Sequence, residues 1–220
     1  NEEVLDNSGR KHKGVLNGQD LAGWEATYEA PLTYHYAGLE IGKCGPWSQG
    51  PVQLQTLALL NEMGVADWNP VSTDFVHGVT EALKLAFADR EAYYGDPDFV
   101  KVPLKQLLSR EYNRERSKEI SNQASLELRP GKISGFEVRM PEFDSSGRGD
   151  ERFSAMGIGE PTVSKKGETR GDTCHVDVVD RWGNMVSATP SGGWLQSSPV
   201  IPELGFCLNS RAQMFWLQEG

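Results

Sequence analysis

The stretch from Gly171 to Thr189 constrains the fold of this 220-residue chain more than any other. It follows a long segment without hydrophobic periodicity, and Thr173 places a hydroxyl near its start. The valines within 176–179 favour a pleated strand, and the turn-forming residues 180–184 let 185–189 return as a second strand. The sequence therefore predicts an antiparallel hairpin with Thr173 at the head of its first strand.

A threonine at the head of a strand suggests a specific chemistry. If the peptide bond between Asp172 and Thr173 is cut, the threonine hydroxyl becomes a nucleophile, and its own freed α-amine can act as the general base. We therefore predict a cleavage site between these two residues, with Thr173 as the catalytic residue of the product.

The composition argues against several other functions. The net charge is -9 and 38% of the residues are hydrophobic, so we expect neither wholesale disorder nor a nucleic-acid partner. The three cysteines are odd in number and lack CxxC spacing, and none of the four histidines has ligand spacing to another. No glycine-rich loop follows a convincing strand. We therefore expect no metal, no cofactor and, without a run of about eighteen apolar residues, no membrane span in this chain.

Residues 1–128 are predicted to be mostly helical. Asn17 can cap a short helix that Trp24 would anchor, and residues 30–41 suit a hairpin around Gly38. These elements would precede the longer helices of the region.

Two longer helices are predicted from their apolar stripes, at 51–64 and 73–95. Four charged side chains of the second helix are expected to face water: Glu81, Lys84, Asp89 and Arg90. Two shorter, charged helices at 103–108 and 111–120 are expected on the surface.

From residue 129 to 172 the composition shifts toward proline, glycine, serine and charge, and the scattered apolar residues show no period. Segments of this length are generally functional or mobile. A mobile linker that ends at Thr173 would give a scissile bond the exposure and slack that cleavage needs. The predicted organisation is thus a helical region at 1–128, a linker at 129–172 and a strand region at 173–220.

Six short motifs stand out along the chain: Leu21-Ala22-Gly23-Trp24, Gly45-Pro46-Trp47-Ser48-Gln49-Gly50, Tyr94-Gly95-Asp96-Pro97, Arg129-Pro130-Gly131, Asp172-Thr173-Cys174-His175 and Gly205-Phe206-Cys207-Leu208-Asn209. Their order and spacing resemble the γ-glutamyltranspeptidase family. The pattern Thr-x-His-x-x-Val-Val-Asp-x-x-Gly-Asn, which begins at Thr173, is the most specific of these signals. The resemblance covers nearly all of the chain.

The resemblance implies an α+β, four-layer αββα N-terminal-nucleophile hydrolase fold, incomplete in this chain. It also implies a precursor that cleaves itself. The Thr173 hydroxyl would attack the carbonyl carbon of Asp172, the acyl group would shift from nitrogen to oxygen, and water would release the amine. The mature enzyme would transfer the acyl group of a γ-glutamyl or related small-molecule amide to water or to an amine.

The resemblance further implies that this chain is an internal fragment. Residues 1–128 would belong to the C-terminal part of the large subunit, and residues 173–220 would begin the small subunit. The partners would then be the remaining segments of the same precursor, assembled as a heterodimer. Because the oxyanion-stabilising segments would lie outside this chain, we expect the fragment alone to be inactive.

The family places a second hydroxyl eighteen residues after the nucleophile to hold it in position. Counting from Thr173 reaches Ser191, where serine stands in place of the usual threonine. Two positions later, Gly193 stands where the family usually has an asparagine or a similar polar contact to the substrate. The resemblance therefore predicts Ser191 as a second catalytic residue and a changed contact at Gly193.

The segment Asn209-Ser210-Arg211-Ala212-Gln213-Met214-Phe215 is similar to the family's Asn-Asn-Gln-Met-Asp-Asp-Phe motif. Met214 stands where the family's Asp grips the substrate α-amino group, and losing a buried charged contact of this kind costs roughly 2–5 kcal/mol. Arg211 could instead favour an extra carboxylate on the acyl side. The predicted substrate-binding residues are Gly193, Asn209, Ser210, Arg211 and Met214. His175 and Asp177 share a strand face and are further candidates to line the site.

Alternatives to a γ-glutamyl transferase or hydrolase remain. One is an acylase for glutaryl-like or other amides that lack the α-amine, which Met214 favours. Another is a catalytically inactive or binding protein, because Arg148-Gly149-Asp150 and Arg170-Gly171-Asp172 both match the integrin-adhesion tripeptide.

Overall fold

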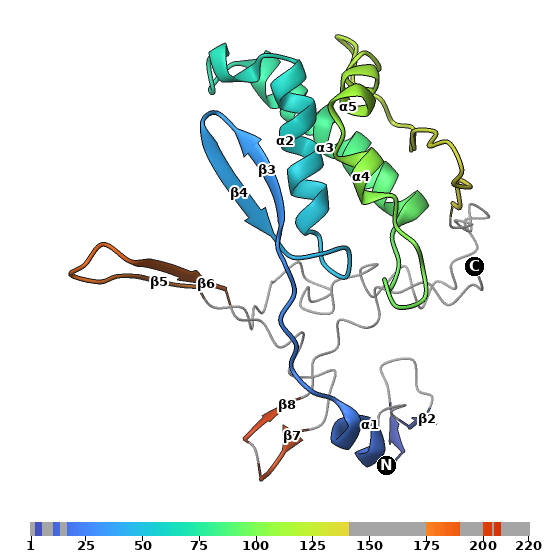
Figure 1. Ribbon diagram of the computed structural model, residues 1–220, viewed down its shortest axis with the longest axis vertical. Coiled ribbons are helices and arrows are strands. Elements are labelled where there is room, and N and C mark those ends of the chain that lie inside the picture. The colour runs from blue at the N-terminus through green and yellow to red at the C-terminus, as the bar shows by residue number, and fades with distance from the viewer. Residues whose placement is uncertain are drawn as a thin grey trace. The chain divides into compact units, whose positions relative to one another are not determined.

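The structure is a computed structural model of the chain, and it describes residues 3–5, 11–13, 17–140, 175–189, 200–203 and 205–207. The chain forms two compact units. One comprises residues 1–25 and 143–218, and the other comprises residues 26–142 with 219–220. The second, here called the helical unit, holds most of the described elements (Figure 1).

The helical unit runs from a β-hairpin into a set of helices (Figure 1). Its elements are β3 (Leu32–Tyr36), β4 (Leu39–Lys43), α2 (Gly50–Glu62), the 3-10 helix η1 (Val65–Asp67), α3 (Thr73–Tyr93), α4 (Leu104–Leu107) and α5 (Arg110–Ser117). The sequence predicts each of these except η1.

Strands β3 and β4 pair antiparallel, with Tyr34 opposite Ile41. Ala37 and Gly38 connect them with φ angles of 49° and 81°. A two-residue turn with positive φ at both positions matches the twist of the flanking strands, and glycine adopts that conformation without strain. The predicted hairpin around Gly38 is confirmed.

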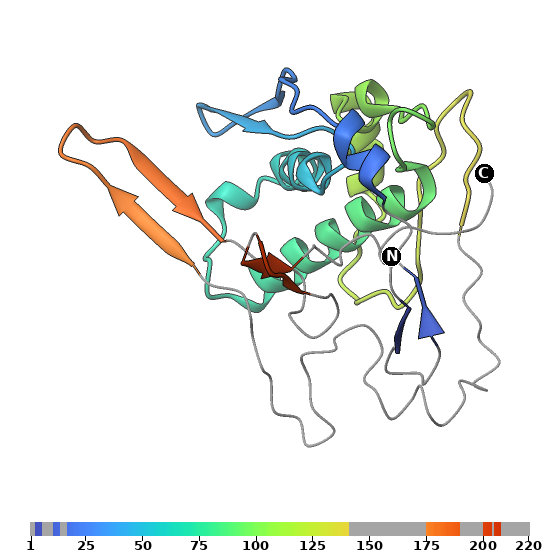
Figure 2. The same cartoon turned by 90° about the horizontal axis from the view of Figure 1, so that it is seen from below.

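Helix α2 is buried on most of its surface. Figure 2 shows it between the β3–β4 hairpin and α3, and α5 also packs against it. Pro51 lies in its first turn, where the fixed φ of proline is favourable. Gly64 follows its end with a φ of 68°, the left-handed conformation that commonly closes a helix. The helix therefore forms the centre of this unit.

Helix α3 begins after Ser72, whose Oγ accepts the backbone N–H of Phe75 at 3.2 Å and caps the first turn. Ala82 and Ala86 are fully buried, and their small side chains let α3 approach α2 closely. The main core cluster contains Val52, Leu59, Leu60, Val65, Ala82, Leu85 and Ala86.

Two acidic side chains of α3 are buried, contrary to the prediction. Glu81 and Asp89 are 1% and 0% exposed. The prediction is wrong for both because α3 is covered on more than one side. Helix α2 packs on one face, and residues 119–133 bind along another through the hydrogen bonds described below. Lys84 and Arg90 remain partly exposed.

The short helices α4 and α5 are predicted on the surface, but they bury part of their side chains. Leu107 and Asn113 are 0% exposed, and Arg116 is 3% exposed. The amide of Asn113 donates to the carbonyl oxygens of Leu107 and Ser109, each at 2.8 Å. These polar groups are buried because they satisfy backbone and carboxylate acceptors between elements.

Residues 118–140 follow α5 without regular secondary structure, yet they pack on the helices. Ile133 joins a second core cluster with Ala92, Tyr93 and Leu107. The packed region therefore continues past the predicted boundary at residue 128. The remainder of the predicted linker, from 141 to 172, lies outside the described residues.

The described elements of the other unit are one helix and three antiparallel strand pairs. They are α1 (Gly18–Gly23), β1 (Val4–Leu5) with β2 (Lys11–His12), β5 (Val176–Val179) with β6 (Met185–Ala188), and β7 (Val200–Ile201) with β8 (Phe206–Cys207). Asn17 caps α1 as predicted: its Oδ1 accepts from Gln19, and Asp20 accepts from the Asn17 N–H. Trp24, however, is 73% exposed and does not anchor the helix.

Within the described ranges, we find no helix with the length and apolar character needed to cross a membrane.

Candidate active site

The β5–β6 hairpin is the predicted strand pair that follows Thr173. Its register is Val176 opposite Ala188 and Val179 opposite Met185. The connection is closed by Asp180, whose carboxylate accepts the backbone N–H groups of Trp182 and Asn184 at 2.9 Å each. The hairpin is confirmed at the positions that the sequence predicts.

Asp180 also fixes where the hairpin turns. The side-chain amide of Asn184 donates to it at 2.8 Å, and this hydrogen bond is the main reason that the pKa of Asp180 lies below its ordinary value. Gly183 has a φ of 86°, which a residue with a side chain rarely adopts. A turn specified in this way leaves little freedom for the strand register to slip.

The alternation of residues gives the hairpin two chemically different faces. One face carries Val176 and Val178 on β5, with Val186 and Ala188 opposite them. The other face carries Val179 opposite Met185 near the turn and Asp177 opposite Ser187, and the polar residues continue to His175 and Thr189 just beyond the strands. Because side chains alternate along a strand, the polar groups form a continuous row on one face.

His175 is hydrogen-bonded through both ring nitrogens. Its Nε2 lies 2.9 Å from Oδ2 of Asp177, and its Nδ1 lies 2.7 Å from Oγ1 of Thr189. The His175–Thr189 contact crosses from one strand to the other, one position beyond the last backbone pair. The prediction that His175 and Asp177 share a face is confirmed, whereas their place in an active site stays a prediction.

The other predicted site residues lie outside the described residues. They are Asp172, Thr173, Ser191, Gly193, Asn209, Ser210, Arg211 and Met214. Both adhesion-like tripeptides, at 148–150 and 170–172, also lie there.

Sequence reasoning missed a buried polar centre in the helical unit, built around Asp89. Its Oδ2 accepts from the amide of Gln55 at 2.5 Å and from the hydroxyl of Tyr112 at 2.8 Å. Its Oδ1 accepts from Arg116 at 3.2 Å and from the backbone N–H of Gly131 at 2.7 Å. One carboxylate therefore joins α2, α3, α5 and the chain after them.

The charges around Asp89 are consistent with these donor roles. Burial, followed by the nearby Asp89 charge, raises the pKa of Tyr112, so its hydroxyl stays protonated and donates. The pKa of Arg116 is also raised, because the charge of Asp89 and the contact with Glu119 outweigh the effect of burial. Helical spacing could have predicted the burial of Asp89, because this residue follows Ala82 by seven positions and Ala86 by three and so lies on the apolar stripe of α3.

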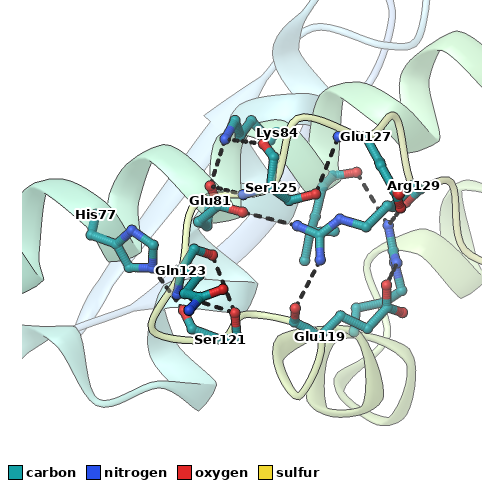
Figure 3. A network of polar contacts seen from close by, with 11 residues as sticks. His77, Glu81, Lys84, Glu119, Ser121, Gln123, Ser125, Glu127 and Arg129 are labelled. Carbon is teal, nitrogen blue, oxygen red and sulfur yellow. Dashed lines mark hydrogen bonds and ion pairs between the residues drawn. The ribbon is translucent and has the colours of Figure 1, made fainter.

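A second buried carboxylate, Glu81, holds the segment 119–131, here called the strap (Figure 3). Arg129 donates to Glu81 at 2.9 Å, and Lys84 bridges Glu81 and the carbonyl oxygen of Ser125. His77 contacts the carbonyl oxygen of Ser121 at 2.7 Å. Three residues of α3, one turn apart, thus bind successive points of the strap.

The pKa of Glu81 reflects this environment. Burial alone would raise the pKa, but the hydrogen bonds from Lys84 and Ser125 and the charge of Arg129 lower it below its ordinary value. Glu81 therefore stays ionised near neutral pH. The arrangement fixes the Arg129-Pro130-Gly131 motif on the helices; at Gly131 a side chain would collide with Tyr112 and Arg116.

The sequence profile of the gamma-glutamyltranspeptidase family matches residues 3–220. The chain belongs to this family. Its fold is accordingly the α+β fold of the N-terminal-nucleophile hydrolases, represented in part. The predicted family and fold class are confirmed.

Three relatives illustrate the likeness. The glutathione hydrolase proenzyme of Bacillus subtilis subsp. natto is 28% identical over 216 residues, covering 97% of this chain and 34% of the relative. The acylase ACY 1 proenzyme of Pseudomonas sp. (strain SE83) is 32% identical over 199 residues, covering 90% of this chain and 30% of the relative. The solved structure of LmbA2991HD is 50% identical with a TM-score of 0.75, covering all of this chain and 35% of that one. The chain thus spans about a third of the length of the curated relatives that it matches.

Proposed function

We propose that this chain is part of an autoprocessed, γ-glutamyltranspeptidase-like amidohydrolase. The protein would be cleaved between Asp172 and Thr173 and would transfer a γ-glutamyl or related acyl group from a glutathione-like amide to water or an amine. The regions 1–128 and 173–220 would then belong to the large and small subunits of a heterodimer. The processing site would end the predicted 129–172 segment, of which residues 129–140 pack on the helices.

The register of the β5–β6 hairpin supports this proposal most directly. Val176 pairs with Ala188, and His175 is hydrogen-bonded to Thr189 one position further. Two positions beyond His175 and Thr189, the same register would set Thr173 opposite Ser191, on the polar face. Directly opposite residues have Cβ atoms about 4.5–5.5 Å apart, a separation at which two short hydroxyl side chains can hydrogen-bond. An extended register of this kind would be consistent with the proposed spacing of eighteen residues between the nucleophile and its supporting hydroxyl.

The proposed reaction follows from these groups. The Thr173 hydroxyl oxygen attacks the carbonyl carbon of the substrate amide, and the hydroxyl proton passes to the free α-amine of the same residue. The amide C–N bond breaks, and the leaving amine takes that proton. Water or an acceptor amine then cleaves the resulting ester and regenerates the threonine. In this scheme Ser191 orients the attacking oxygen.

We propose that this protein recognises the acyl group of its substrate differently from a standard γ-glutamyltranspeptidase. Gly193, Asn209, Ser210, Arg211 and Met214 would form the substrate-binding residues. A thioether at Met214 cannot pair with an α-ammonium group, whereas the guanidinium of Arg211 can bind a carboxylate. The likeness to an acylase proenzyme supports a second candidate function, an acylase for glutaryl-like amides.

A comparison of γ-glutamyl and glutaryl anilides tests the function and the acyl preference together. The two compounds differ only in the α-amino group, so the ratio of their kcat/KM values reports on its recognition. We expect the full-length protein to hydrolyse at least one anilide and the Thr173→Ala variant to hydrolyse neither. A glutaryl preference would support the acylase function. A strong γ-glutamyl preference would show that another residue replaces the missing carboxylate, and hydrolysis of neither anilide by the wild type would contradict both candidate functions.

A further inference from the structure

We infer that the groove between α2 and α3 is a docking surface for a further helix of the same precursor, one that lies outside these 220 residues. The inference rests on the proposed function in one respect only, that the chain is part of a longer protein. The groove has a volume of about 260 Å³. Its walls include Val52, Gln53, Thr56 and Leu57 of α2 with Leu83 and Phe87 of α3.

Helix α3 presents an uncharged row of side chains along this groove. Val76, Thr80, Leu83 and Phe87 follow one another at intervals of four, three and four residues. Val76 is 60% exposed and Leu83 is 38% exposed. Alternating intervals of three and four are the spacing at which one helix packs along another. At 1.5 Å per residue the row is about 17 Å long, so it would contact about three turns of a partner helix.

The two threonines do not make the groove polar. The hydroxyl of Thr56 donates to the carbonyl oxygen of Val52 at 2.8 Å, and that of Thr80 donates to the carbonyl oxygen of Val76 at 2.7 Å. Because these protons are satisfied within their own helices, covering the threonines strands no donor. The face therefore suits an apolar occupant.

The distribution of charge indicates the same kind of occupant. Residues 50–61 of α2 contain no charged side chain, although 24% of the whole chain is charged. On α3, Glu81 and Lys84 are engaged with the strap. The first charge that continues the row is Arg90, which lies over the Phe87 ring and pairs with Glu91. An occupant with an uncharged, apolar stripe would thus bury no unpaired charge.

Two arguments favour a segment of the same precursor over a second copy of the chain. The chain covers only 34% of the length of the Bacillus subtilis subsp. natto proenzyme, so the proposed precursor contains further segments. A covalently joined segment is present at high effective concentration and loses little translational freedom on docking. A row about 17 Å long and one helix wide, about 10 Å, also offers far less than the roughly 800 Å² that each partner buries in a standard interface.

Photo-cross-linking in the full-length protein tests the inference. The probe p-benzoylphenylalanine replaces Gln53 or Leu57, two groove residues one helical turn apart, and it replaces Leu126 of the strap as a control, because Leu126 is 99% exposed. Mass spectrometry of the irradiated protein then identifies the residues to which each probe is joined. One turn of α2 spans about 6 Å, which corresponds to four residues of a helix but to about two residues of a strand.

We expect both groove probes to react with one segment outside residues 1–220 of the same molecule, at positions three or four residues apart. The Leu126 probe should give no such adduct. As a second measurement, Leu83→Lys should lower the melting temperature by more than about 5 °C and the yield of both adducts roughly tenfold, because it buries an unpaired charge. Leu126→Lys should change the melting temperature by less than about 1 °C.

Four outcomes would overturn the inference. They are adducts confined to residues 1–220, adducts that join two copies of the protein, targets two residues apart as on a strand, and equal melting temperatures for Leu83→Lys and Leu126→Lys. Cross-linking requires no activity, so the proposed function is judged separately. An inactive, uncleaved wild type that gives the expected adducts would contradict the proposed function and support the docking surface, whereas a cleaved and active wild type without them would do the reverse.

Discussion

Asp89 accepts four hydrogen bonds from three parts of the helical unit, namely α2, α5 and the strap, and it is 0% exposed. Burying a carboxylate is costly unless it is paired and its lone pairs are filled. Arg116, which is only 3% exposed, supplies the opposite charge. The buried charge of Asp89 is therefore tolerable inside the protein because Arg116 is present.

The substitution Asp89→Asn tests this dependence. It removes the negative charge and leaves the Arg116 guanidinium buried, so we expect the free energy of unfolding to fall by about 3–5 kcal/mol. Chemical denaturation of the full-length protein would measure the change. Asp74→Asn is a matched control on the same helix, because Asp74 is exposed in the first turn. This substitution should lower the free energy of unfolding by less than about 1 kcal/mol. Equal losses in the two variants would show that Asp89 is not a structural centre.

At the scale of elements, regular spacing made most of the helical unit predictable. The apolar stripes predict α2 and α3, and Gly38 predicts the turn between β3 and β4, because these signals are local. The burial of Glu81 and Asp89 was not predicted. Most of their partners come from the strap and from α5, which have no apolar period that would assign them to the core.

The β5–β6 hairpin was predictable for the same reason. Its valines favour a strand, and residues 180–184 form a turn in which Asp180 accepts hydrogen bonds from Trp182 and Asn184. The likeness to the transpeptidases then added the roles of Thr173 and Ser191, which no local pattern could supply. The contact between His175 and Thr189 depends on the register of two strands and became visible only in the structure.

The attachment of the strap to α3 should depend on pH. The folded-state pKa of Glu81 is lowered, so its ionisation contributes stability that is fully present above its unfolded value, near 4.5, and is lost as the pH falls through the lower folded value. Glu81→Gln should therefore destabilise the protein by about 3 kcal/mol at pH 7, where Lys84 and Arg129 lose their partner. Below pH 4 the difference in unfolding free energy between Glu81→Gln and the wild type should shrink.

Denaturation of both proteins from pH 3 to 7 would measure this trend. Glu115→Gln is the appropriate control, because Glu115 is paired with Lys118 on the surface of α5 and lies outside the strap. If the difference in unfolding free energy between the wild type and Glu81→Gln grew as the pH fell, the predicted pH dependence would be wrong.

At the scale of the whole molecule, the packed helical unit reaches at least residue 140, so the region between it and Thr173 is shorter than the sequence predicts. The strap fixes the chain up to Gly131 through Asp89, and Ile133 joins the core. We expect self-cleavage to leave the helical unit intact, because its two described core clusters lie between residues 52 and 140, before the cleavage site.

The proposed function depends on one event, cleavage between Asp172 and Thr173. Mass spectrometry of the purified full-length protein measures it directly. We predict two fragments, one of which begins with Thr173, and a single intact chain in the Thr173→Ala variant. An intact wild-type chain that nevertheless hydrolyses a γ-glutamyl or glutaryl anilide would contradict the assignment of Thr173 as an N-terminal nucleophile.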